Sequence, residues 1–525
     1  MKVNDSDSTN ESIRIPQILT DILDGKLQIT GINDFEFKEF KGFAESPYNI
    51  LNDKKYYDQT IPSFMAGIDN VVLVSTGGSN LGARSFVEIC SIGSEHSFHY
   101  ANSTNEYEIL KLMETLDLNK TGFLIASKSG DTVEILSLFK YFYNEIDKIS
   151  NTNITGDQFI AITEAGSLLD HIARQYDFHD IIHTDSSLVG RFSVFSPFGT
   201  CLAYMAGVSL ENISTGAISL LEIVKKHDSG EEISDLIYFI FDAWKSNKDK
   251  LVIVFSKSLY TFALWIEQII AESLGKEGKG IIPIIQEHSD KLKWVSEDSI
   301  VVFLRDKHSD DFDSSVMGNP YLLRTITIEN DVGLAFEMMK WQLITITLAT
   351  LMSLNPFNQP QVELSKQLAR KFIDDPQLPK PIFDIKESHN CLIDLFKMIK
   401  KSNYVCLLNY VNESAEIMNQ LNSIVDIIVE TLKVPCVVQN APSYLHATGQ
   451  LHKGGLNNGV FVQFLSAECQ SNILIPENDH TFGSLFIAQA DGDFVALNEL
   501  GRKICRIYIG TDFEESFERF RNFLQ

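Results

Sequence analysis

Short apolar runs alternate with longer amphipathic stretches from about residue 50 to the end of the chain. Continuous apolar runs of this length predict strands that are buried on both faces. Their alternation with helical patterns predicts βαβ units and parallel sheets. The predicted strands fall into three series: 71–75, 122–126 and 159–163; then 251–255 and 299–303; then 404–408, 435–438 and 459–463. Helices are predicted from about Leu81 and over Phe262–Leu274.

The three series predict an α/β protein built from two parallel-sheet units and a C-terminal α/β unit. A polar stretch at 225–235 and a proline-rich stretch at 376–381 are the predicted seams between them. The expected organisation is an N-terminal leader (1–50) that packs on the surface, a first unit (51–225), a second unit (226–375) and a C-terminal unit (376–525) that completes the site.

Charge and cysteine content narrow the possible classes of function. The formal net charge is -26, and there is no Lys/Arg-rich run, so we expect neither nucleic acid nor a membrane surface as a partner. An anionic substrate would have to be held by local dipoles and a few placed cations. The seven cysteines are scattered and form no C-x-x-C pair, which is typical of a reducing compartment. The first twelve residues are polar and lack a signal-peptide core, so we expect a cytoplasmic protein.

Two turns that each join a predicted strand to a helix could hold a phosphate group. Thr76–Gly82 contains a Gly-Gly pair, which lets backbone N–H groups approach a ligand. Ala126–Thr132 offers three hydroxyls at a helix start. Each has a plainer interpretation, since Gly-Gly is typical of tight turns and Ser and Thr are common N-caps. Two such turns in one unit favour phosphate binding.

The segment Trp265–Gly280 predicts a helix with a candidate general base. Gln268 and Glu272 are four residues apart and so share one face near the C-terminal end, where the helix dipole raises the basicity of a carboxylate. Such a pair is usually solvated. Here much of the helix is apolar, so we expect both side chains to face a cleft or the interior.

Two downstream segments carry further candidates. Asn355–Pro360 ends one apolar helix and starts another that carries Lys366. A Gly-rich loop contains His446 and His452, whose spacing without a nearby Cys or carboxylate is a poor zinc signature, so no metal is expected. The residues alone leave the choice between these two histidines open.

Five segments together resemble the sugar-isomerase fold and, more narrowly, the glucose-6-phosphate isomerase family. They occur in the expected order over some 300 residues: Gly77–Gly82, Ser127–Gly130, Gly190–Ser193, Ala271–Lys276 and Asn355–Pro360. The chain most resembles the isomerase half of bifunctional transaldolase–isomerase proteins. The resemblance implies two three-layer αβα sugar-isomerase units and the interconversion of glucose 6-phosphate and fructose 6-phosphate. It implies no cofactor and no metal. Because family members are often dimers, it also suggests a homodimer.

The resemblance also implies a role for each matching residue. Glu272 would move a proton between C1 and C2 beside Gln268, and Arg191 would stabilise the cis-enediolate. Lys366 would assist ring opening, with Gln359 nearby, and the segment from Leu445 to Gln450 makes His446 the preferred ring-opening histidine. The expected ligands of the phosphate and nearby hydroxyls are Gly78, Ser79, Ser127, Lys128, Ser129 and Thr132.

The sequence departs from the family pattern at several positions. Asp131 stands where the family usually has Thr, and Val189 replaces a glycine, although Val does not readily adopt a positive φ. The histidine segment follows the Asn-Pro-Phe motif here, whereas it precedes that motif in single-function isomerases. Alternative functions are a dual glucose/mannose phosphate isomerase and an inactive sugar-phosphate sensor. The absence of a helix-turn-helix pattern and the intact catalytic set disfavour the sensor.

Overall fold

The structure is a computed structural model, and it describes the greater part of the chain. The described residues are 5–29, 32, 37–91, 93–149, 155–226, 231–287, 294–309, 321–374, 385–466, 473–510 and 513–524. The predicted seam at 376–381 lies outside them, as does part of the seam at 225–235. The division into units at these seams stays a prediction.

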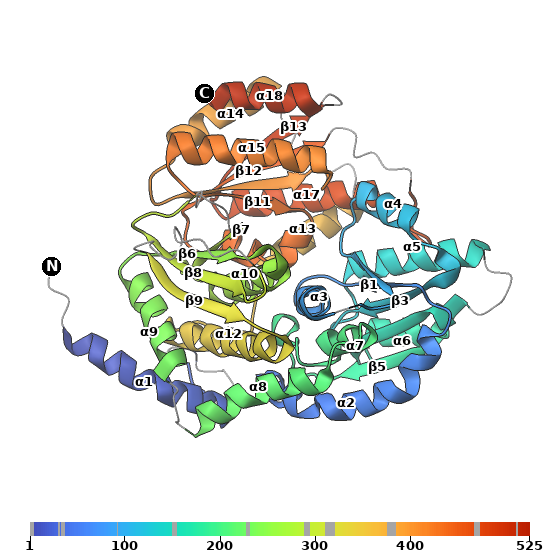
Figure 1. The fold of residues 1–525 in the computed structure, drawn as a ribbon. Helices are drawn as coiled ribbons and strands as arrows, with labels where there is room; N and C mark the ends of the chain where they lie inside the picture. Colours follow the sequence, from blue (N-terminus) through green and yellow to red (C-terminus); the bar gives the residue numbers. More distant parts are fainter. Residues whose placement is uncertain are drawn as a thin grey trace.

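Three parallel sheets form the framework of the molecule (Figure 1). The first has the order β2 (Ser97–Ala101), β1 (Asn70–Val74), β3 (Thr121–Ala126), β4 (Phe159–Glu164), β5 (Asp180–Thr184). The second has β7 (Ile282–Glu287), β6 (Lys250–Phe255), β8 (Ser299–Asp306), β9 (Leu322–Ile328). The third has β11 (Cys436–Asn440), β10 (Tyr404–Tyr410), β12 (Gly459–Ser466), β13 (Lys503–Ile509). Every neighbouring pair is parallel, so the predicted α/β class is confirmed.

Helices cover the faces of these sheets. Before and within the first sheet they are α1 (Asp5–Leu23), α2 (Gly42–Met65), α3 (Gly78–Cys90), α4 (Glu106–Thr115), α5 (Val133–Ile149) and α6 (Leu168–Gln175). Helix α7 (Pro197–Met205) also packs on the first sheet, against α3 and β5. Around the second sheet they are α8 (Leu210–Lys225), α9 (Glu231–Lys245), α10 (Tyr260–Leu274) and α12 (Asp331–Leu351). The later ones are α13 (Val362–Asp374), α14 (Ile385–Lys397), α15 (Ala415–Leu432), α16 (Gly449–Gly454), α17 (Phe482–Glu499) and α18 (Phe513–Leu524). No helix among the described residues is long and apolar enough to cross a membrane.

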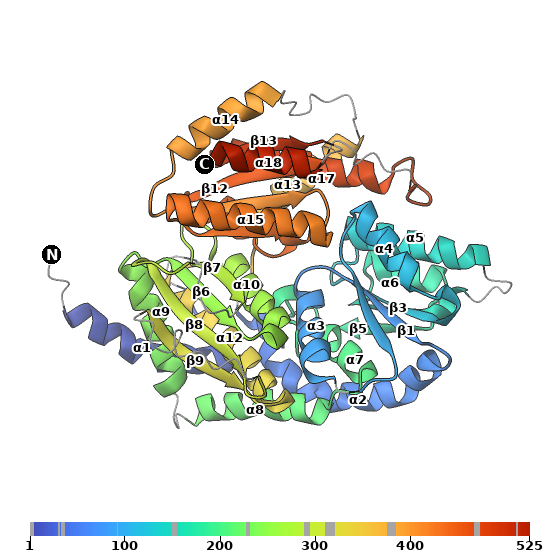
Figure 2. The same ribbon diagram turned by 45° about the horizontal axis from the view of Figure 1, so that its top comes forward.

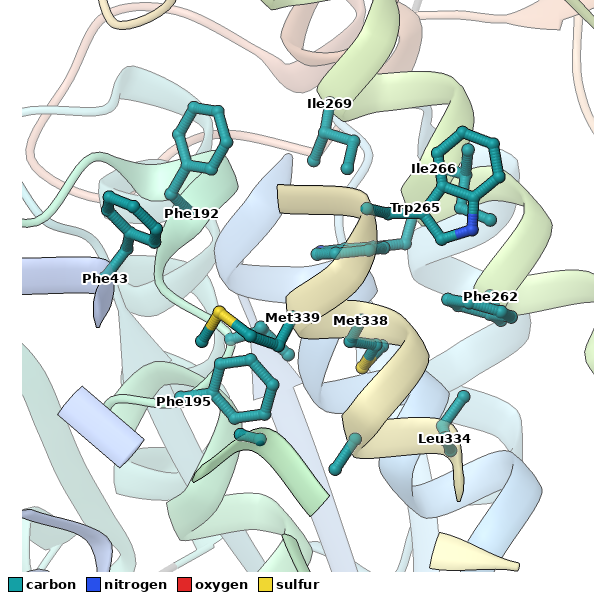
Figure 3. Close-up of a cluster of buried hydrophobic side chains, with 14 of the residues drawn as sticks. Phe43, Phe192, Phe195, Phe262, Trp265, Ile266, Ile269, Leu334, Met338 and Met339 are labelled. Carbon is teal, nitrogen blue, oxygen red and sulfur yellow. The ribbon is translucent and has the colours of Figure 1, made fainter. Parts of the chain in front are cut away.

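Helix α10 is enclosed on nearly all sides. Its residues from Thr261 to Leu274 are buried apart from Leu264. On one side Trp265, Ile266 and Ile269 pack beside Met338 of α12 in the apolar cluster of Figure 3. Phe192 and Phe43 lie in the same cluster. This packing fixes α10 and thereby the polar face that it turns toward the other two sheets.

The three sheets meet near the centre of the molecule. Figure 2 shows the third sheet lying across the first two, with α10 and α3 below it. Helix α10 contacts both α3 and α16. Since β1 and β3 pair in parallel, the turns after their carboxyl ends are neighbours. Both predicted phosphate-binding turns therefore lie at one edge of the first sheet, as is usual for ligand sites in open α/β sheets.

Candidate active site

The proposed base lies on the buried polar face of α10. Gln268 and Glu272 are 1% and 4% exposed, which confirms that they face the interior. The Gln268 Nε2 atom donates to Glu272 Oε2 at 3.2 Å and to the His446 carbonyl at 2.8 Å. One amide thus connects the carboxylate on α10 to the segment that bears His446.

Arg191 places a guanidinium beside this carboxylate. It lies in a short 3-10 helix, Gly190–Phe192, and its Nη1 atom is 3.8 Å from Glu272 Oε2. Its Nε atom donates to Ser273 Oγ at 2.9 Å, and Nη2 donates to the Pro356 carbonyl at 2.5 Å. These bonds hold the planar group in one orientation, so its charge is fixed before any ligand arrives.

The Gly-Gly turn is the point at which these groups converge. Gly77 has a φ of +60°, and a Cβ there would lie 2.9 Å from the His446 carbonyl oxygen and 3.1 Å from Gln268 Nε2. A Cβ on Gly78 would lie 2.4 Å from the Cα atom of Arg191. Larger residues would push these neighbours apart. Ser79 is buried at the start of α3.

His446 faces a carboxylate on α5. Its Nε2 atom lies 3.0 Å from Oε1 of Glu134, which is in the first turn of α5. Burial raises the pKa of Glu134, but the His446 ring outweighs this, and the pKa lies below its ordinary value. The carboxylate is therefore ionised near neutral pH and can orient the imidazole and stabilise its protonated form.

His452 occupies a different environment. It is 3% exposed, and its Nδ1 atom lies 2.9 Å from the Tyr404 hydroxyl in the core of the third unit. Burial lowers the pKa of His452 to about 3. An imidazole with that pKa cannot take up a proton near neutral pH, which supports the choice of His446.

The hydroxyl-rich turn directly precedes α5. Ser127 Oγ accepts from the Gly130 N–H at 3.1 Å and lies 3.1 Å from the Thr132 hydroxyl. Lys128 and Ser129, the other two predicted ligands in this turn, each contact a nearby carboxylate. Lys128 Nζ is 3.1 Å from Glu164 Oε1, and the Ser129 hydroxyl donates to Asp131 Oδ1 at 2.5 Å. The Asp131 carboxylate thus accepts a hydrogen bond from within its own turn.

Gln359 and Lys366 come from the segment after α12. Gln359 Oε1 accepts from Arg191 Nη1 at 3.4 Å and so joins the central group. Lys366 lies on α13, is partly exposed and pairs with Glu363 at 3.2 Å. Its charge makes a small contribution to lowering the pKa of Glu134.

The sequence reasoning missed Glu134 and Lys276. Lys276, which is 1% exposed, donates to the backbone carbonyls of Asn355 and Asn358 at 2.8 and 2.6 Å and thereby ties the end of α10 to the Asn-Pro-Phe segment. Nothing in the sequence marked Glu134 except that it is an acidic residue in the first turn of an amphipathic helix. The departure at Val189 causes no strain, because its φ is -109°.

The electrostatic environment of Glu272 is suited to proton transfer. Burial raises the pKa of Glu272 above its ordinary value, although Arg191 and His446 oppose this. A carboxylate with a raised pKa is a stronger base, and the nearby guanidinium can stabilise a developing oxyanion. Within the described residues, no cluster of three or more His, Cys, Asp or Glu could hold a metal ion.

Comparison with known proteins shows which family the chain resembles. The profile described as phosphoglucose isomerase matches residues 59–296. Glucose-6-phosphate isomerase from Methanocaldococcus jannaschii is 26% identical over 360 residues, which are 60% of this chain and 88% of that protein. Glucose-6-phosphate isomerase from Mesoplasma florum is 24% identical over 391 residues, 64% of this chain and 91% of that protein. Over residues 59–296 the chain is similar to the phosphoglucose isomerase family.

Solved structures agree on the fold. A glucose-6-phosphate isomerase from Chlamydia trachomatis superposes with a TM-score of 0.55 at 16% identity, covering 75% of this chain and 90% of that one. A hypothetical protein from Thermus thermophilus gives a TM-score of 0.58 at 19% identity, covering 70% and 97%. The phosphoglucose isomerase profile includes Arg191 and Glu272 but ends before Gln359, Lys366 and His446. The roles of these residues, and the narrower resemblance to bifunctional proteins, stay predictions.

Proposed function

We propose that this chain catalyses the reversible isomerisation of glucose 6-phosphate and fructose 6-phosphate through ring opening and a cis-enediolate. The observation that carries the proposal is the buried Glu272 carboxylate, 3.8 Å from Arg191 and hydrogen-bonded through Gln268 to the segment that bears His446. The match of residues 59–296 to the phosphoglucose isomerase profile supports the same reaction.

The phosphate binds first, at the carboxyl ends of β1 and β3. Ser127 and Thr132 supply hydroxyls there, and the N–H groups at the starts of α3 and α5 supply positive dipole ends. Gly78, Ser79, Lys128 and Ser129 are the further proposed ligands of the phosphate and nearby hydroxyls. On a chain with a net charge of -26, such local donors are what make an anion site possible.

Ring opening follows on the side of the third unit. The hemiacetal needs a proton removed from the hydroxyl on C1 and a proton delivered to the ring oxygen. His446, oriented by Glu134, and Lys366 are the groups proposed for these two transfers. The protonated imidazole is stabilised by the ionised carboxylate 3.0 Å away.

Proton transfer between carbons then uses the α10 side. Glu272 removes the proton from C2 of the open aldose, the electron pair forms the enediolate, and Arg191 stabilises the negative charge on oxygen. The proton on the C2 oxygen passes to the C1 oxygen, and Glu272 returns the carbon-bound proton to C1, which gives the ketose. The base acts on one face of the substrate, so part of the transferred hydrogen exchanges with solvent.

The test is Glu272→Gln, compared with Glu267→Gln on the same helix. Loss of a general base lowers kcat by about 10²–10⁴-fold. Glu267 is also a buried glutamate, but its carboxylate accepts from Gln439 and lies outside the proposed chemistry. The assay couples formation of glucose 6-phosphate from fructose 6-phosphate to NADPH. Full turnover in Glu272→Gln, or no isomerase activity in the wild-type chain, would refute the proposal.

Location and assembly belong to the same proposal. We propose a cytoplasmic enzyme that forms a homodimer, as the resemblance to this family suggests. Light scattering coupled to gel filtration tests the assembly, because a 59.2 kDa particle would exclude the dimer. Fractionation of source cells tests the location.

A further inference from the structure

Helix α17 touches three separate parts of the proposed ring-opening machinery. It runs along the third sheet and extends toward α4 and α5 of the first unit (Figure 1). Its residues Gln489, Gly492 and Asp493 lie within about one turn of each other. None of the three was singled out by the sequence, and none lies in a motif of the family resemblance.

Gln489 holds the carboxylate that faces His446. Its Nε2 atom donates to Glu134 Oε1 at 2.7 Å, which is the same oxygen that lies 3.0 Å from the His446 ring. The Gln489 amide is itself fixed, because Thr104 donates to its Oε1 atom at 2.7 Å. Gln489 is 4% exposed, so no water competes easily for these bonds. The amide therefore sets where the carboxylate, and with it the imidazole, can lie.

Asp493 holds both ends of the segment that bears His446. Its carboxylate is fully buried and pairs with Lys453 Nζ at 2.5 Å, and the Tyr444 hydroxyl donates to its other oxygen. Tyr444 precedes His446 by two residues, and Lys453 follows it by seven. The Asp493 carboxylate thus anchors the chain on both sides of His446. Removal of its charge would leave the buried Lys453 ammonium without its partner.

Gly492 brings α17 against the helix that carries Lys366. A Cβ at this position would lie 2.7 Å from the Ala369 N atom and 2.9 Å from the Ser365 carbonyl oxygen, both on α13. The absence of a side chain therefore sets the distance between the two helices.

We infer that α17 is the positioning element for ring opening, with Gln489 and Asp493 as positioning residues that keep the His446–Glu134 pair in register with Lys366. This inference rests on the proposed function. It predicts that changes in α17 impair ring opening and leave proton transfer by Glu272 intact.

Ring opening can be measured apart from isomerisation. Opening and reclosing the ring interconverts the α and β anomers of glucose 6-phosphate without any transfer of the C2 proton. Exchange NMR on the two anomers therefore reports ring opening, and the coupled assay reports the whole reaction. Glu272→Gln should keep anomer exchange while losing isomerisation.

The variants are Asp493→Asn and Gln489→Leu, with Asp491→Asn as the matched control. Asp491 lies on the same helix and forms an equally buried ion pair, with Arg506 at 2.6 Å, but does not contact the histidine segment. Misplacement of a reacting group by about 1 Å can cost about 100-fold in rate. We expect anomer exchange to fall at least about tenfold in Asp493→Asn and Gln489→Leu. It should stay near the wild-type rate in Asp491→Asn.

Folding of each variant is checked by circular dichroism and thermal melting. If Asp493→Asn does not fold, Gln489→Leu, which removes two hydrogen bonds but no charge, decides the question. The inference is overturned if the folded variants retain wild-type anomer exchange, or if Asp491→Asn loses as much as they do. A wild-type chain without isomerase activity would instead refute the proposed function.

Discussion

The buried carboxylate of Glu267 should make the stability of this protein depend on pH. Glu267 is 5% exposed, and the amide of Gln439 donates to its Oε1 atom at 3.0 Å. Burial raises the pKa of Glu267 to about 7, against an ordinary value of 4.5. The folded protein therefore holds this proton over a range of pH in which the unfolded chain has already released it.

The sign and size of the effect follow from this difference. Between about pH 4.5 and pH 7 the folded state binds more protons than the unfolded state, so the free energy of unfolding falls as the pH rises. A difference of about 2.5 pKa units at about 1.4 kcal/mol per unit gives about 3 kcal/mol. That contribution is fully lost above about pH 8. Glu267→Gln is neutral at every pH and keeps an acceptor for Gln439.

The assay is urea denaturation of wild type and Glu267→Gln at several values between pH 5 and pH 8.5. The stability difference should be small at pH 5 and should grow to about 3 kcal/mol in favour of the variant above pH 8. Burial also raises the pKa of Glu413 to about 7, but Glu413 is present in both proteins and cancels in the difference. Glu499→Gln, an exposed change, controls for loss of charge. A difference that is flat or that shrinks with rising pH would refute the reasoning.

Three further substitutions test other parts of the structure. Gly78→Ala would place a methyl group 2.4 Å from the Cα atom of Arg191, so we expect overpacking to cost about 1–3 kcal/mol and kcat/KM to fall; thermal melting and the coupled assay measure these. Lys250→Met removes a fully buried ammonium that lies 2.5 Å from Asp298 and 2.6 Å from Asp249, and the two stranded carboxylates should lower the unfolding free energy by about 3–5 kcal/mol in urea denaturation. His452→Gln should leave the pH profile of kcat unchanged, because burial holds the pKa of His452 at about 3; a lost limb in that profile would contradict this.

Strands in the interior of the sheets could be predicted from the sequence, whereas most edge strands could not. Seven of the predicted strands, β1, β3, β4, β6, β8, β10 and β12, have neighbours on both sides, and β11 is the one predicted strand that lies at a sheet edge. Such strands are buried on both faces and appear as continuous apolar runs. The strands that were missed, β2, β5, β7, β9 and β13, all lie at sheet edges. In β2 and β5 exposed positions carry Ser97 and His183, which interrupt the apolar run.

The site was predictable where its residues lie in local motifs and not where they meet across the chain. Glu272 and Gln268 share a helical spacing that the sequence displays directly. Glu134 lies 312 positions from its partner His446, and Gln489 lies 355 positions from Glu134. No periodicity connects positions so far apart, because their contact depends on how the third unit packs against the first. The Glu134 side chain could be interpreted only after that packing was known.

The candidate site contains side chains from segments around all three sheets, and the histidine segment comes late in the chain. A nascent chain of which only the first two sheets have emerged from the ribosome would therefore be inactive, even if both sheets had folded. Turnover would begin only once α17 had emerged and docked. The return of catalysis during refolding would accordingly report the last long-range docking step and lag behind the recovery of secondary structure.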